Sequence, residues 1–177
     1  MAGASPGPTS GIFRYGRENA NLFTFFPSLA GGVYTPIQVS GASNTFPEGI
    51  NNNGEVVGFY LLSSNSHVGY GFTLSSGTYT TDIVVPGAIS TCLTGINDSG
   101  ELAGFYCAPA SGTNCLENSV GALGFVGSNG AYSTVTIPGF TSVFVYTISN
   151  AGVIAGEVDT NYVAADDIRE GFIDVPK

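Results

Sequence analysis

Basic residues are scarce in this chain of 177 residues, which has four Lys and Arg in total and a formal net charge of −9. A protein that binds nucleic acid or an anionic membrane surface needs a stripe of basic residues that displaces counterions. Four cations spread along the chain cannot form such a stripe. We therefore expect no nucleic-acid partner.

Tryptophan is absent, and histidine occurs once, as His67 in a loop rich in Ser and Asn. Serine-hydrolase chemistry needs a nucleophile, a base and an orienting acid, and the chain has no G-x-S-x-G elbow that would present the nucleophile. We interpret His67 as a solvated loop residue and assign no catalytic residue.

Long apolar runs are also missing. No uninterrupted apolar stretch reaches the roughly 20 residues that a membrane-spanning helix needs, so we expect no membrane insertion. Residues 1–8 have neither the basic nor the apolar part of a secretory signal peptide, and residues 1–21 are expected to form a flexible leader. A charge-poor composition rich in Gly, Ser and Thr is typical of exported proteins. We therefore expect an extracellular or cell-surface location, with the signal peptide not present in this sequence.

Glycine and aromatic residues are abundant instead, with 26 Gly, 12 Phe and 9 Tyr. They recur in a pattern. Residues 49–60 (GINNNGEVVGFY) return as residues 95–106 (GINDSGELAGFY) and, more weakly, as residues 147–158 (TISNAGVIAGEV). A period of roughly 45–50 residues indicates stacked or radially arranged supersecondary units.

A second motif follows the first, because residues 71–88 match residues 124–140 and a degraded copy precedes them at residues 23–42. The apolar runs are short and show no sustained helical period, so we predict strands and almost no helix. In the best-defined unit, one strand leads into residue 50 and three follow at 55–61, 70–74 and 78–85. The Gly that closes the first turn is expected to adopt a left-handed conformation.

Four antiparallel strands with this period are typical of a β-propeller blade. We predict an all-β repeat protein of four-stranded antiparallel units, β-propeller-like, with a small or oligomer-completed ring. The predicted single repeat domain spans residues 22–177 and divides into a partial unit 22–44, unit 45–88, unit 89–140 and a partial unit 141–177. Incomplete end units leave an open strand edge, so we expect a homo-oligomer formed by strand pairing.

The run G-I-N-x-x-G-x-x-x-G-x-Y, followed by G-F, G-x-Y-x-T and P-G-A, resembles the HAF repeats of bacterial extracellular proteins. Residues 49–88 and 95–139 carry this resemblance, which extends over about residues 22–174. The third copy departs from it at Thr147, Ser149 and Glu157. The resemblance implies an exported repeat protein and brings no catalytic motif.

The three cysteines are Cys92, Cys107 and Cys115. Cys107 and Cys115 bracket the one long insertion between units, where a disulfide would staple the base of the loop. Three reduced thiols are the alternative. Cys92 falls where a buried strand residue is expected.

Candidate binding residues recur at equivalent positions of the two best copies. Tyrosine rings beside amide and carboxylate groups suit stacking on sugars and hydrogen bonding to them, although packing is the alternative role for each ring. Equivalent acids could also meet at one end of a ring, as the paired carboxylates of a glycosidase do. The candidates are Tyr60, Tyr106, Asn52, Asp98, Glu55 and Glu101.

An acidic segment near the C-terminus is the candidate metal site. Asp159, Asp166 and Asp167 supply hard oxygen ligands of the kind that Ca²⁺ prefers, although their spacing is not that of an EF-hand loop. Calcium is therefore a possible cofactor, and we predict no other.

These observations favour a binding or structural repeat module over an enzyme. Glycan or a cell-surface polymer is the expected partner class. One alternative is a glycan-active hydrolase or lyase that uses the repeated carboxylates. Another is a self-assembling surface protein that closes by strand sharing.

Overall fold

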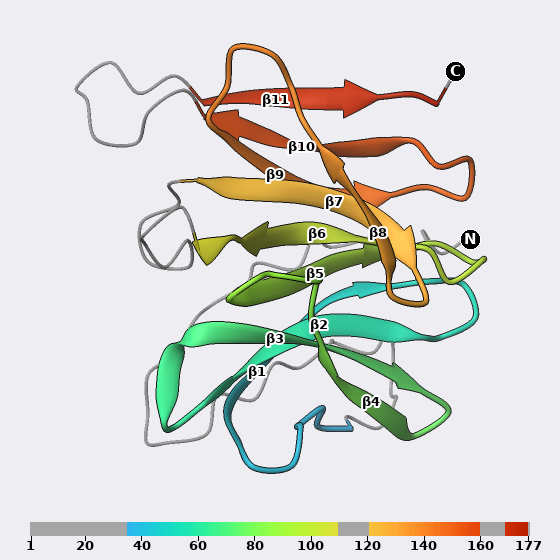
Figure 1. Ribbon diagram of the computed structural model, residues 1–177. Coiled ribbons are helices and arrows are strands. Elements are labelled where there is room, and N and C mark those ends of the chain that lie inside the picture. The colour runs from blue at the N-terminus through green and yellow to red at the C-terminus, as the bar shows by residue number, and fades with distance from the viewer. Residues whose placement is uncertain (1–34, 110–120, 160–168, 177) are drawn as a thin grey trace, which may run out of the picture.

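The computed structural model describes residues 35–109, 121–159 and 169–176, which form β-strands and no α-helix (Figure 1). The strands are β1 (Ala42–Ile50), β2 (Val56–Leu62), β3 (Asn65–Ser75), β4 (Thr78–Ile83), β5 (Ser90–Ile96), β6 (Leu102–Cys107), β7 (Ala122–Ser128), β8 (Ala131–Val135), β9 (Ser142–Ile148), β10 (Ile154–Asp159) and β11 (Arg169–Asp174). In the described ranges, no helix has the length and apolar character needed to cross a membrane. The prediction of an all-β protein is confirmed.

The strands form three antiparallel sheets, each a simple meander of strands consecutive in the sequence. Sheet A has the order β1-β2-β3-β4, sheet B the order β5-β6-β7-β8, and sheet C the order β9-β10-β11. Sheet B lies between sheets A and C in Figure 1. Within the described residues each sheet is open, and no strand is shared between two sheets.

The predicted strands of the first unit are close to the observed ones, but two differ in extent. β3 begins at Asn65, earlier than predicted, because it forms a long hairpin with β2. β4 ends at Ile83, because Asp82 adopts a left-handed backbone conformation with φ of 58° and interrupts the pairing register. Val85 then leaves the sheet and is buried in the core between sheets A and B.

The core lies between successive sheets. Val57 of sheet A packs in one cluster with Leu93 and Phe125 of sheet B. Ala103 of sheet B packs in a second cluster with Val145 of sheet C. Because each sheet buries apolar side chains against its neighbour, the three sheets hold together through the hydrophobic effect.

A glycine in the second strand of sheet B allows close packing within that sheet. A Cβ atom at Gly104 would overlap the main-chain carbonyl oxygen of Cys92 and would lie 3.0 Å from the ring of Phe125. Only glycine fits where a backbone and a ring approach from the same side. The second strands of the other two sheets show the same arrangement at Gly58 and Gly156.

Two buried serines tie a first strand to the sheet before it. The main-chain N–H of Gly69 in sheet A donates to Oγ of Ser90 at the start of sheet B, over 2.9 Å. The main-chain N–H of Gly121, directly before β7 of sheet B, donates to Oγ of Ser142 at the start of sheet C, over 3.0 Å. The two bonds join successive sheets in the same way, at aligned serines of β5 and β9.

Sheet C lacks two residues that, at the aligned positions of sheet B, contact the following sheet. Gly95 of sheet B faces β9 so closely that an added Cβ would lie 3.0 Å from Cα of Thr147. Phe105 of sheet B packs edge-on against Phe144 of sheet C at 5.0 Å between ring centroids. In sheet C, the positions aligned with Gly95 and Phe105 carry Thr147 and Glu157.

Candidate functional site

Three turns join the first and second strands of the sheets, and each is closed by hydrogen bonds to its first side chain. In the turn of sheet B, Oδ1 of Asn97 accepts the main-chain N–H groups of Ser99 and Glu101 at 3.1 and 2.9 Å. Asn51 makes the equivalent bonds in sheet A. An Asn side chain that satisfies backbone donors two and four residues on is the ordinary way such a turn is stabilised.

The same Asn side chains also join one turn to the next. The side-chain Nδ2 of Asn51 donates to the main-chain oxygen of Asn97 over 3.1 Å, and Nδ2 of Asn97 donates to the main-chain oxygen of Ser149 over 3.4 Å. Asn51 is 9% exposed and Asn97 is 3% exposed. Buried amides that are fully used as donors and acceptors hold their neighbours in a defined position.

Asp98 lies at the centre of this arrangement. Its carboxylate accepts the main-chain N–H and the side-chain Nδ2 of Asn52 at 2.9 and 2.8 Å, and it also accepts Nδ2 of Asn150 at 2.7 Å. Its own N–H donates to Oδ1 of Asn150 at 2.8 Å. The hydrogen bonds from Asn52, and then that from Asn150, stabilise the ionised carboxylate and lower the pKa of Asp98.

We name this set of three turns, residues 51–55, 97–101 and 149–153, the turn row. Its buried amides fix the backbone, while several polar side chains remain exposed along it. Amides both donate and accept hydrogen bonds, and carboxylates accept them, which suits a ligand rich in hydroxyl groups. The exposed polar side chains are those of Asn52, Asn53, Ser99, Ser149 and Asn150.

Glu55 and Glu101 belong to the turn row and are already engaged within it. Oε2 of Glu55 accepts Nδ2 of Asn51 at 2.7 Å, and Oε2 of Glu101 accepts Nδ2 of Asn97 at 3.1 Å. Each carboxylate therefore orients the amide that links its turn to the next.

Tyr60 and Tyr106 lie apart from the turn row and contribute to packing. Tyr60 is 4% exposed, and its hydroxyl donates to Oδ1 of Asp82 at 2.6 Å. Burial, together with the neighbouring Asp82, raises the pKa of Tyr60 to about 12. Tyr106 is partly buried, packs edge-on against Phe125, and shares a 2.9 Å hydrogen bond with the hydroxyl of Thr134.

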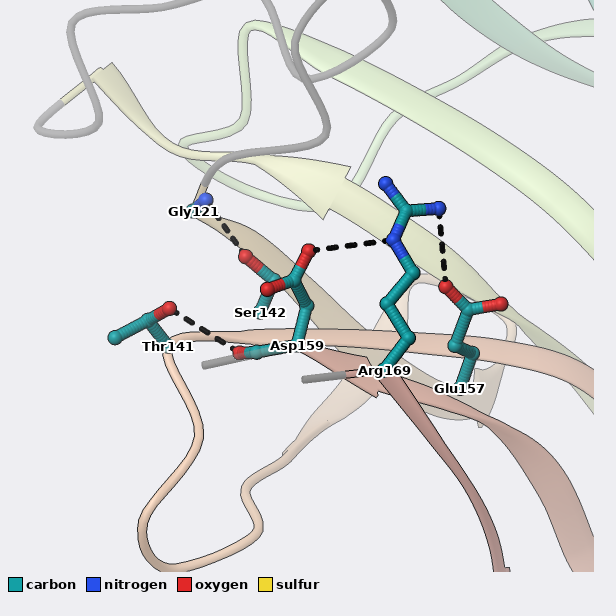
Figure 2. Close-up of polar contacts among 6 residues, drawn as sticks. All are labelled: Gly121, Thr141, Ser142, Glu157, Asp159 and Arg169. Atoms are coloured by element: carbon teal, nitrogen blue, oxygen red, sulfur yellow. Dashed lines mark hydrogen bonds and ion pairs between the residues drawn. The ribbon is translucent and has the colours of Figure 1, made fainter. Parts of the chain in front are cut away.

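The acidic segment near the C-terminus is followed by a basic residue, Arg169, whose side chain lies beside two of the carboxylates. Figure 2 shows the Arg169 side chain between those of Asp159 and Glu157. Nε of Arg169 is 3.8 Å from Oδ2 of Asp159, and its Nη1 donates to Oε1 of Glu157 at 3.4 Å. In the ranges that the structure covers, no group of three or more potential ligands is placed to hold a metal ion. The predicted ligands Asp166 and Asp167 lie outside the described residues.

The cysteines divide into two kinds. Cys107 is disulfide-bonded, and Cys115, its predicted partner, lies outside the described residues. Cys92 is a free thiol, 1% exposed, and burial raises its pKa far above the usual range. A protonated, enclosed thiol is chemically inert, so Cys92 is a core residue. His67 is exposed on β3.

Comparison of the chain with protein-family models, with curated proteins and with solved structures finds no match. The resemblance to HAF repeats therefore stays a prediction that depends on the motif residues alone. The predicted leader, residues 1–21, and most of the partial unit 22–44 also lie outside the described residues.

Sequence reasoning missed two features of the site. The bridging role of Asn51 and Asn97 was not predicted, although the 46-residue repeat of the Asn was a usable signal. The partner of Tyr60 was also missed. Its signal is that the segment from Tyr79 to Pro86 is one residue longer than that from Tyr132 to Pro138, and Asp82 belongs to this extra length.

Proposed function

We propose that this chain is a non-enzymatic repeat module that acts outside the cell and binds a neutral glycan or cell-surface polymer along the turn row. The observation that carries the proposal is the hydrogen bonding between successive turns. It holds exposed amide and hydroxyl groups of three sheets in one continuous line. A site that is rigid before binding loses little entropy on binding a ligand.

The charge of the chain supports a neutral ligand over a polyanion. Asp98, Glu55 and Glu101 lie in the turn row, and the whole chain has a net charge of −9. A polyanion would approach against this charge, whereas a polyhydroxyl polymer would meet only hydrogen-bonding groups.

The engagement of the carboxylates supports a binding role over hydrolysis. A glycosidase needs one carboxyl group to donate a proton and another to attack or to activate water. Glu55 and Glu101 each accept a hydrogen bond from the first Asn of their own turn. In this proposal the two glutamates build the binding surface.

A binding experiment with purified chain tests the proposal. Cellulose, chitin and xylan serve as neutral probes, and polygalacturonate serves as the acidic probe. The double variant Asn53→Ala, Ser99→Ala removes two exposed polar groups, together with their bonds to the main-chain oxygen of Asp98 and to Oδ1 of Asn97, while the side chains of Asn51 and Asn97 remain. We expect it to weaken binding by about tenfold. Thr78→Ala, an exposed change on β4, is the matched control. Binding to no neutral probe, or equal loss in the control, would contradict the proposal.

A second candidate is self-assembly by strand sharing in a propeller-like array whose blades are the sheets. One observation favours it: among the described strands, β11 pairs with β10 alone, whereas β3 and β7 are paired on both sides. An unpaired strand edge is a template for another strand. Light scattering over a wide concentration range tests it, and a strict monomer would remove this candidate.

A further inference from the structure

The chain contains two Asn-Gly pairs, Asn53-Gly54 and Asn129-Gly130. They differ in the hydrogen bonds that their side-chain amides make. Asn-Gly is the sequence most prone to spontaneous deamidation, because glycine leaves the following main-chain nitrogen sterically open. All four residues are exposed, so exposure alone does not separate the two pairs.

Hydrogen bonds restrain the first pair. The N–H of Asn53 donates to Oδ1 of Asn51 at 3.0 Å, and its Nδ2 donates to the main-chain oxygen of Asp98 at 3.1 Å. The N–H of Gly54, the group that would attack, donates to the main-chain oxygen of Asn51 at 3.1 Å. The attacking nitrogen and the leaving amide are both held by the turn row.

The second pair lies in the two-residue turn between β7 and β8, where Asn129 has φ of 52° and Gly130 has φ of 82°. Across the part of the chain that the structure describes, the side chain of Asn129 makes no hydrogen bond. The leaving amide is therefore unrestrained, in contrast to that of Asn53, and the one interaction at the attacking group is that of the Gly130 N–H with the Tyr132 hydroxyl.

We propose that Asn129 is a site of spontaneous deamidation in the folded protein and that the turn row protects Asn53 from the same reaction. The main-chain nitrogen of Gly130 attacks Cγ of Asn129 and loses its proton, and the C–N bond of the side-chain amide breaks to release ammonia. Water then opens the resulting succinimide at either carbonyl, which gives aspartate or isoaspartate. The reaction needs no reactant other than water.

The product changes the turn in two ways. It adds one negative charge to a chain that already carries −9. Isoaspartate also places an extra carbon in the main chain of a turn that pairs Ser128 with Ala131, which alters the register of the hairpin.

Peptide mapping by mass spectrometry after incubation in mildly alkaline buffer tests the proposal. In the folded chain we expect Asn129 to react at least about tenfold faster than Asn53, since the hydrogen bonds of Asn53 and Gly54 must break first. In denaturant the two rates should converge. Faster or equal reaction at Asn53 in the folded chain, the same rate ratio in both states, or an Asn129 that reacts only in denaturant would overturn it.

The chain offers a matched control. The aligned turn between β3 and β4 has Ser76 with φ of 49° followed by Gly77 with φ of 80°, so serine is accommodated in this turn. Asn129→Ser should fold normally and lose the reaction at residue 129, while Asn53 reacts at its original slow rate. Accelerated reaction at Asn53 in this variant would contradict independent protection by the turn row.

Discussion

The side-chain amide of Asn51 donates to the main-chain oxygen of Asn97 at 3.1 Å, and these two residues occupy the same position in successive copies of the motif. Asn97 repeats the contact toward Ser149. A single residue type thus closes its own turn and fixes the position of the next.

Replacement of Asn97 by Ala should destabilise the chain by about 2–3 kcal/mol, because it leaves the N–H groups of Ser99 and Glu101 without their acceptor and breaks the bond to Ser149. Denaturant unfolding followed by circular dichroism would measure the change. Asn97→Ser should cost less, since Ser149 accepts the N–H of Val153 in the aligned turn. Both variants lose the bond to Ser149, so equal losses would show that a side-chain acceptor for the N–H groups of the turn contributes nothing.

The lowered pKa of Asp98 predicts a pH dependence of stability. Because the folded state binds the proton more weakly than the unfolded state, the ionised carboxylate stabilises the fold above the ordinary value of 3.8. This contribution should disappear as pH falls through the lower, folded-state pKa. Asp98→Asn should therefore be less stable than the original chain at neutral pH, and the two stabilities should converge in acid. A constant difference at all pH values would exclude this role.

Gly104→Ala should destabilise the chain by about 3 kcal/mol, because its Cβ would overlap the main-chain oxygen of Cys92 in the middle of sheet B. Gly171→Ala on β11 is the matched control, since the nearest atom to its added Cβ is 3.8 Å away. The control should change stability by less than about 0.5 kcal/mol. Thermal unfolding compares the two variants, and similar melting temperatures would refute the close-packing argument.

Calcium removal should leave stability unchanged. The guanidinium of Arg169 already lies beside the carboxylates of Asp159 and Glu157, and a cation in that position opposes the binding of Ca²⁺. Melting curves with and without EDTA measure this directly. A lower melting temperature in EDTA would instead support the calcium site predicted from Asp159, Asp166 and Asp167.

We expect sheet C to pack poorly against a further sheet, because it has Thr147 and Glu157 at the positions aligned with Gly95 and Phe105 of sheet B. The double variant Thr147→Gly, Glu157→Phe restores the pattern of sheet B. It should strengthen self-association by about 2 kcal/mol through burial of the new ring. Analytical ultracentrifugation measures the shift. Glu170→Phe, which adds the same ring to β11, is the control. An equal effect of this variant would indicate non-specific hydrophobic association.

The sequence was sufficient to predict strands, turns and an absence of helix, because those follow from local patterns. Gly54 and Gly100, for example, were expected at positive φ, and they have values of 78° and 80°. The environment of Tyr60 could not be predicted in this way. It depends on the bulge at Asp82, which brings a carboxylate from β4 to a ring on β2.

The hydrogen-bond and ion-pair partners of the candidate residues also could not be predicted from the sequence. Asn52 and Asp98 were chosen because they recur at equivalent positions. Their mutual hydrogen bonds depend on how far sheet B is displaced from sheet A, which no local pattern specifies. The same applies to Asp159, whose arginine neighbour comes from β11 across a segment of the chain that lies outside the described residues.

The meander order of the sheets has a consequence for how the protein forms. Each of the described strands pairs only with strands next to it in the sequence, and the core clusters of the described residues join sheet A to sheet B and sheet B to sheet C. The strand pairing within each sheet can therefore form as soon as its own segment leaves the ribosome, and the core follows when the next sheet packs against it. Damage to the middle sheet would leave its two neighbours to fold or fail separately.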